Sequence, residues 1–166
     1  MAQLRRVAQL TVNSFLLIAS FALIAVAAYN SIRVAHSNTT NVVPAIGTKI
    51  DIPEVPWRES RKTVVLVAST HCHFCTASAD FYRRLRSLAE TRGIPIVAVF
   101  PQTNVEATAY LAKLNIPITK VRQASLADLN VPGTPTLIIV DSEGKVTDTW
   151  AGQLPPQVEK VVFSKL

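Results

Sequence analysis

Several residue types are scarce in this sequence, and each shortage narrows the possible functions. Charged residues make up only 17% of the 166 residues and hydrophobic residues 49%, which excludes a disordered tail or a nucleic-acid-binding arm. There are only two cysteines, Cys72 and Cys75, and only three histidines, of which His36 is distant from the other two. The chain therefore has few cysteine and histidine side chains from which a complete four-ligand metal site could be built. No acidic residue precedes Asp51, and the chain contains no internal repeat.

The N-terminal part lacks charge over a long stretch. Residues 11–29 contain no charged side chain and are mostly apolar; a membrane-spanning helix needs roughly 17–25 such residues. We expect a transmembrane anchor there, or a cleaved signal peptide with the Ala-Val-Ala of residues 25–27 as its cleavage pattern. Arg5 and Arg6 precede this run, and positive charge favours the cytoplasmic side. The expected topology is single-pass in the cell inner membrane, with residues 1–10 cytoplasmic and the remainder periplasmic or extracytoplasmic, where disulfide chemistry is possible.

The remainder divides into a linker and one domain. Residues 30–49 are rich in Asn, Ser, Thr and Val without a clear period and are predicted to be the linker, and residues 50–166 form the domain. Apolar and β-branched runs predict strands at residues 63–68, 95–100, 118–121, 136–140 and 145–150, the last two as a hairpin. Helices are expected from Cys75 to Gly93, from a Thr103-x-x-Glu106 capping box to about Leu114, and from Pro155 onward. This order predicts an α/β sandwich with a mixed central sheet.

Two of the expected helices have apolar stripes. The stripe of the first consists of Phe74, Ser78, Phe81, Leu85 and Leu88, and that of the last consists of Val158, Val161 and Val162. The arginines of the run Arg83-Arg84-Leu85-Arg86 lie largely off the first stripe, and no aromatic residue is interleaved with them. This pattern predicts a solvated helix face, and we expect no nucleic-acid partner.

The Cys-x-x-Cys pair lies where a strand passes into a helix. Unpaired N–H groups and the helix dipole favour the thiolate of Cys72 there. Cys75, one turn later, is placed to complete a two-step thiol–disulfide exchange. His71 and His73, if protonated, would lower the pKa of Cys72 further, and if neutral either could transfer a proton. The same spacing occurs in zinc sites, so a structural disulfide, buried thiols and a metal-binding protein or metallochaperone using the cluster at 71–75 stay open as alternatives.

A second unusual motif follows about sixty residues later, in Val-Pro-Gly-Thr-Pro-Thr at residues 131–136. Proline cannot donate to a strand ladder, but it is tolerated where a strand begins. A cis Thr134–Pro135 bond would turn the Thr134 backbone toward the start of the cysteine-bearing helix.

Together these motifs, with Asp141-x-x-Gly144 after the later strand, resemble the thioredoxin superfamily over residues 62–166. With the N-terminal segment, the chain resembles the membrane-anchored bacterial TlpA/ResA-like thiol–disulfide oxidoreductases. The resemblance implies a thioredoxin-like three-layer sandwich, no metal and no organic cofactor. It also implies that Cys72 attacks, that Cys75 resolves, and that Pro135 is a cis-proline beside Thr134, whose backbone binds extended, cysteine-containing protein substrates. Electrons would come from a partner dithiol, such as that of a membrane protein.

The sequence departs from that family at the positions that tune the chemistry. The usual tryptophan, buried acid and glutamate are replaced by His71, Leu66 and Ser78, and the dipeptide between the cysteines is His73-Phe74, without a proline. The proton acceptor for Cys75 is therefore open among His71, His73, Asp80 and water. Reduction, as in cytochrome c maturation, is what the resemblance most suggests, although oxidation and isomerisation are chemically compatible.

Overall fold

The computed structural model describes Ile24 and residues 43–166. The expected cytoplasmic segment, almost all of the expected anchor or signal peptide, and linker residues 30–42 lie outside the described residues. Over the described part of the chain, no helix is both long enough and apolar enough to cross a membrane.

Five strands form one mixed sheet in the order β3-β2-β1-β4-β5. The strands are β1 (Lys62–Val67), β2 (Ile96–Phe100), β3 (Lys120–Gln123), β4 (Thr136–Asp141) and β5 (Val146–Ala151). The first three are parallel, and β4 is antiparallel to both β1 and β5, so the predicted mixed sheet and hairpin are confirmed. Register pairs Val67 with Thr136, and Thr136 with Ala151. The end of β1, the start of β4 and the end of β5 therefore meet at one edge of the sheet.

Four of the five strands lie within one residue of their expected bounds, and the third shows a larger shift. The strand expected at residues 118–121 begins two residues later, because the Ile118 N–H donates to the carbonyl of Ile116 (2.8 Å) and holds the chain in a turn. At the other end of the domain, the Gly47 N–H donates to the carbonyl of Val146 (2.7 Å) and the Val146 N–H to that of Thr48 (2.8 Å). The last residues of the expected linker thus hydrogen-bond to the outer edge of β5.

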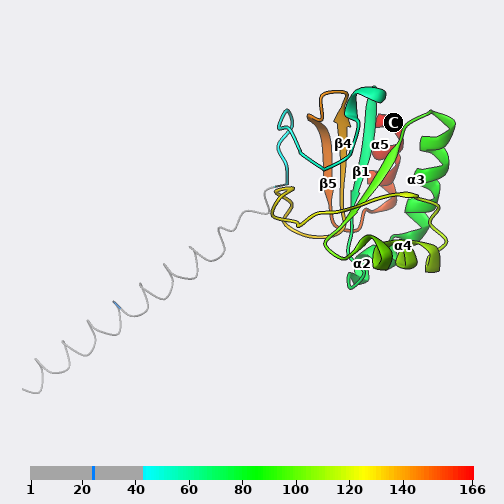
Figure 1. Ribbon diagram of the computed structural model, residues 1–166. Coiled ribbons are helices and arrows are strands. Elements are labelled where there is room, and N and C mark those ends of the chain that lie inside the picture. Colours follow the sequence, from blue (N-terminus) through cyan, green and yellow to red (C-terminus); the bar gives the residue numbers. More distant parts are fainter. Residues whose placement is uncertain (1–23, 25–42) are drawn as a thin grey trace, which may run out of the picture. The chain divides into compact units, whose positions relative to one another are not determined.

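The helices are α2 (His73–Ala77), α3 (Ala79–Thr91), α4 (Asn104–Lys113) and α5 (Pro156–Lys165), and a short 3-10 helix, η1, covers Trp57–Glu59. The predicted capping box is confirmed, because Thr103 accepts from the Glu106 N–H (3.3 Å) and Glu106 accepts from the Thr103 N–H (3.1 Å). Helices α3, α4 and α5 pack through one core cluster against one face of the sheet, where Val64 and Leu66 point. In Figure 1, α3 and α5 both lie to the right of β4 and β5.

Among the described residues no α-helix covers the opposite face of the sheet, where the only helical residue that packs is Trp57 of the 3-10 helix η1, and this corrects the expected three-layer sandwich. The opposite face, with Val65 and Val67, is covered by an extended segment with Ile50 and Ile52 and by a loop carrying Leu129 and Val131. The connections β1-α3-β2 and β2-α4-β3 both add strands in the same direction across the sheet. Right-handed crossovers then place both helices on the same face. The sequence order alone does not reveal that direction.

The expected apolar stripes are also partly wrong. Ser78 separates α2 from α3, and its Oγ donates to the carbonyl of Phe74 (2.8 Å), a bond that bends helices. Phe74 consequently lies outside the stripe with 56% of its surface exposed, whereas Phe81 and Leu85 are buried as expected. In α5 Val162 is buried but Val161 is 48% exposed.

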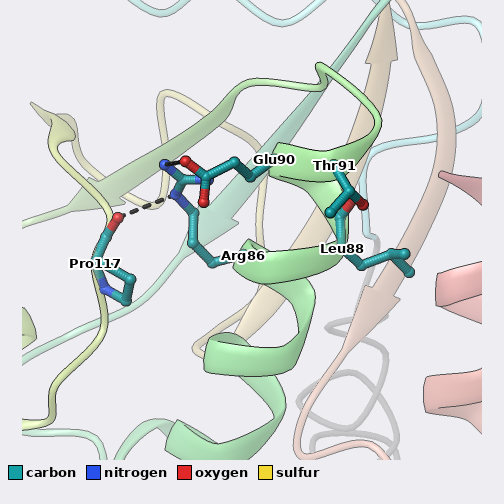
Figure 2. Close-up of polar contacts among 5 residues, drawn as sticks. All are labelled: Arg86, Leu88, Glu90, Thr91 and Pro117. Carbon is teal, nitrogen blue, oxygen red and sulfur yellow. Dashed lines mark hydrogen bonds and ion pairs between the residues drawn. The ribbon is translucent and has the colours of Figure 1, made fainter.

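The arginine run ties α3 to neighbouring segments. The Nε of Arg86 donates to the carbonyl of Pro117 (3.0 Å), and its guanidinium pairs with Glu90 (3.1 Å), as Figure 2 shows. Arg84 pairs with Glu159 of α5 (2.5 Å). Arg84 and Arg86 therefore form hydrogen bonds and ion pairs within the domain, in addition to being partly exposed to solvent.

Candidate active site

The two cysteines lie at the edge of the sheet where β1 ends. Cys72 is the N-cap residue of α2, and its sulfur accepts a hydrogen bond from the backbone N–H of Cys75 (3.0 Å). The two residues are joined by a disulfide, with their Cα atoms 5.2 Å apart. A sulfur at an N-cap receives the N–H groups that have no partner inside the helix, and this arrangement favours a thiolate once the disulfide is reduced.

Burial distinguishes the two sulfurs. Cys75 is completely buried within the core cluster beneath the helices, whereas Cys72 is half-buried at its edge. A thiol or disulfide of another protein can therefore reach Cys72 first. This arrangement fits the expected attacking and resolving positions.

The loop before β4 faces Cys72. The Thr134–Pro135 bond is cis, as the sequence predicted, and the carbonyl oxygen of Thr134 lies 3.3 Å from the Cys72 sulfur. The loop is held on both sides, because the Gly152 N–H donates to the Pro135 carbonyl (2.7 Å) and the Thr136 hydroxyl donates to that of Gly133 (2.8 Å). The structure thus brings together the two motifs that are about sixty residues apart in the sequence.

The flanking histidines have different surroundings. His71 is exposed, and its Nδ1 lies 3.4 Å from both the Thr70 hydroxyl and the Gln102 side-chain nitrogen. His73 is also exposed, and its ring contacts Phe74 edge-on with the ring centroids 5.7 Å apart. The sequence analysis did not identify Gln102 as a site residue. The one feature of the sequence that indicates it is its position just after β2, the strand that neighbours β1.

Asp80, the third side chain among the candidate proton acceptors, lies in the first turn of α3. Asp80 has an exposed side chain and pairs with Arg83. Ser78, three residues after Cys75, is buried and its carbonyl accepts from the Tyr82 N–H (3.1 Å), and burial raises the pKa of the Tyr82 hydroxyl well above its ordinary range. That hydroxyl is therefore protonated at neutral pH and has no hydrogen-bond partner among the described residues.

The cysteine pair has no third metal ligand in the part of the chain that the structure describes. No group of three or more histidine, cysteine, aspartate or glutamate side chains is arranged there to hold an ion. Cys72 at the start of α2, joined by a disulfide to the buried Cys75, is an arrangement that can exchange disulfides.

A comparison with protein families decides the assignment. The model of the Redoxin family matches residues 23–163, most of the chain. The chain belongs to the redoxin family. The expected resemblance to the thioredoxin superfamily is thus confirmed, and this redoxin is a thiol–disulfide oxidoreductase. No curated protein sequence matches this redoxin.

Solved structures share the fold at low sequence identity. One is a protein assigned as thiol:disulfide interchange protein DsbE, from Chlorobium tepidum, with a TM-score of 0.59, 19% identity, and coverage of 74% of this chain and 95% of that one. A thiol-disulfide isomerase from Corynebacterium glutamicum matches with a TM-score of 0.56, 13% identity, and coverage of 78% and 97%. The thioredoxin domain of a thiol-disulfide oxidoreductase from Bacteroides vulgatus matches with a TM-score of 0.53 and 16% sequence identity. The match covers 76% of this chain and 96% of that one. This redoxin therefore has a thioredoxin-like α/β fold.

Proposed function

We propose that this redoxin is a membrane-anchored, extracytoplasmic oxidoreductase that reduces disulfides in protein substrates. One observation carries the proposal. The half-buried Cys72 at the start of α2 forms a disulfide with the fully buried Cys75, and its sulfur lies 3.3 Å from the carbonyl oxygen of Thr134. The uncharged residues 11–29 after Arg5 and Arg6 support the anchor and the extracytoplasmic location.

The reaction consists of two exchanges of one sulfur for another. The Cys72 thiolate attacks one sulfur of the substrate disulfide, so that a mixed disulfide forms and the other substrate sulfur leaves as a thiolate. Cys75, after losing its proton, then attacks the Cys72 sulfur. The Cys72–Cys75 disulfide forms and the second substrate thiolate leaves, so two electrons have passed to the substrate. A partner dithiol, which we place in the membrane, returns them to Cys72 and Cys75.

Substrate would lie along the loop that faces Cys72. The backbone of Thr134 is held at the edge of the sheet, and an extended peptide can hydrogen-bond to it. Recognition through main-chain groups suits cysteine-containing segments of varied sequence.

The experiment that tests the reaction is reduction of insulin by the full chain and by its Cys72→Ser and Cys75→Ser variants. Cys72→Ser is expected to be inactive, and Cys75→Ser is expected to accumulate mixed disulfides that dithiothreitol releases. Full activity in Cys72→Ser, or no trapped substrate in Cys75→Ser, would contradict the proposal.

Separate measurements test the direction of electron flow and the side of the membrane on which the domain lies. A reduction potential near the roughly −270 mV of thioredoxin supports a reductase, whereas one above roughly −180 mV indicates an oxidase or isomerase. For location, a membrane-impermeant maleimide should label Cys72 of the reduced protein in intact spheroplasts. Labelling only after lysis would place the domain in the cytoplasm.

A further inference from the structure

Gln102 reaches the turn that leads into Cys72. Strands β1 and β2 are parallel neighbours, so their ends lie at the same edge of the sheet. Gln102 is half-buried, two residues beyond β2, and its side chain contacts three consecutive residues beyond β1: Ser69, Thr70 and His71. One side-chain amide therefore spans the turn that immediately precedes Cys72.

The orientation of the Gln102 amide follows from its partners. The backbone N–H of Thr70 can only donate, and it does so to Oε1 of Gln102 (3.3 Å). The NH2 group must then face the other two residues, donating to the Ser69 hydroxyl (3.0 Å) and lying 3.4 Å from Nδ1 of His71. The Ser69 oxygen also accepts from the His71 backbone N–H (3.3 Å), so backbone and ring of His71 are both held.

We propose that Gln102 is a positioning residue that fixes the ring orientation and the neutral tautomer of His71 beside Cys72. An amide NH2 has no lone pair to offer, so Nδ1 of His71 accepts and the proton of the neutral ring is on Nε2. The Thr70 hydroxyl, also 3.4 Å from Nδ1, can donate to it as well. Nε2 is then the nitrogen through which His71 exchanges protons at the active site.

His73 provides an internal contrast. It flanks Cys72 on the other side, yet its ring contacts only the edge of Phe74 in the interactions that the structure shows. Nothing comparable holds its tautomer. This inference rests on the proposed function for its catalytic meaning, since His71 matters only if Cys72 exchanges disulfides. Its structural content can be tested separately.

The test is nitrogen-15 NMR of the full-length, reduced chain at alkaline pH, with labelled histidine. The chain has only three histidines, so His36 and His73 serve as references in each spectrum. In the wild type, His71 should give the Nε2–H pattern. In Gln102→Leu its two nitrogen shifts should move toward each other as both tautomers become populated, while in Gln102→Glu, whose carboxylate accepts from Nδ1–H, the pattern should invert.

The matched control is Gln157→Leu, because Gln157 is an exposed glutamine on α5, remote in sequence from the cysteines. It should leave the His71 pattern unchanged. An unchanged His71 pattern in both Gln102 variants, or an equal change in Gln157→Leu, would overturn the proposal. Because Gln102→Glu retains the bond from the Thr70 N–H, it keeps the test informative if Gln102→Leu loses its fold.

Activity supplies the second readout. Gln102→Leu should slow insulin reduction about two- to tenfold, the factor that one hydrogen bond of ordinary strength represents, and should change its pH profile. In a His71→Ala background the same substitution should have no further effect; an equal loss there would show that Gln102 acts independently of His71. If the chain reduces no disulfide at all, the proposed function fails, yet the tautomer result still decides whether Gln102 orients His71.

Discussion

Phe74 of α2 and Phe81 of α3 lie on consecutive helices and have opposite environments. Phe81 is 4% exposed and packs against Tyr82 and Phe163, with ring centroids 5.7 and 5.6 Å away, whereas Phe74 is 56% exposed. Truncating a buried phenylalanine to alanine costs about 3–5 kcal/mol through lost burial and the cavity left behind. Truncating a half-exposed one outside the core should cost no more than about 0.5 kcal/mol.

Urea unfolding of the oxidised domain, residues 43–166, measures both costs. With a denaturant slope of about 1–3 kcal/mol/M, Phe81→Ala should lower the midpoint by roughly 2 M and Phe74→Ala by no more than roughly 0.3 M. Phe81→Leu, which removes less volume, provides a variant that stays folded. Midpoint shifts of similar size for Phe74→Ala and Phe81→Ala would refute the bend at Ser78 and the burial assigned to the two rings.

The same pair separates stability from substrate binding. Phe74, which lies between the two cysteines in the sequence, lines an open groove with Gly152, Gln153 and Leu154. Phe74→Ala should therefore raise KM for insulin while leaving the unfolding midpoint nearly unchanged. Phe81→Leu should show the reverse, a lower midpoint with KM unchanged.

Three further predictions concern single contacts. Hydrogen bonds from the hydroxyl, and to a lesser extent from the backbone N–H, of Thr103 lower the pKa of Glu106 below its ordinary 4.5. The ionised Glu106 therefore stabilises the folded state above pH 4.5, and this contribution to the free energy of unfolding is lost as the pH falls through the lower folded-state pKa. Between about pH 6 and about pH 3, the unfolding midpoint of the wild type should therefore fall more than that of Glu106→Gln; parallel curves would contradict this. The Arg84–Glu159 pair should contribute about 0.2–1 kcal/mol in a double-mutant cycle, because the arginine is half-exposed, and a coupling near zero would remove it as a link between α3 and α5. Metal analysis of protein purified under reducing conditions should find no stoichiometric ion, whereas one that is lost on mutating His71 would favour a metallochaperone.

Much of the fold follows from local patterns. The β-branched run at residues 63–68 predicts a buried strand, and β1 covers Lys62–Val67. The Thr103–Glu106 capping box is a local arrangement of four residues, so its sequence signature is sufficient to locate the start of α4. The position of Cys72 between a strand and a helix is likewise a local property, and the structure places it there.

The wrong and missing predictions concern features that depend on contacts between residues outside the local sequence pattern. In the part of the chain that the structure describes, α3, α4 and α5 cover one face of the sheet. This arrangement depends on the direction in which β2 and β3 are added to β1, which no local pattern encodes. Phe74 is exposed on α2, which ends at Ser78, whereas Phe81 lies on the next helix, α3. Gln102 lies 31 residues from His71, and its role appears only once the parallel pairing of β1 and β2 brings their ends together. The attacking and resolving roles of the two cysteines stay predictions.

Trapping of a substrate by each single-cysteine variant tests the central claim most directly. With a cysteine-containing peptide disulfide as substrate, the protein that keeps only Cys72 should form a stable mixed disulfide, because the buried sulfur that would release it is absent. The protein that keeps only Cys75 should form little or none, since that residue is completely buried. Equal trapping by both variants, or trapping by Cys75 alone, would contradict the account.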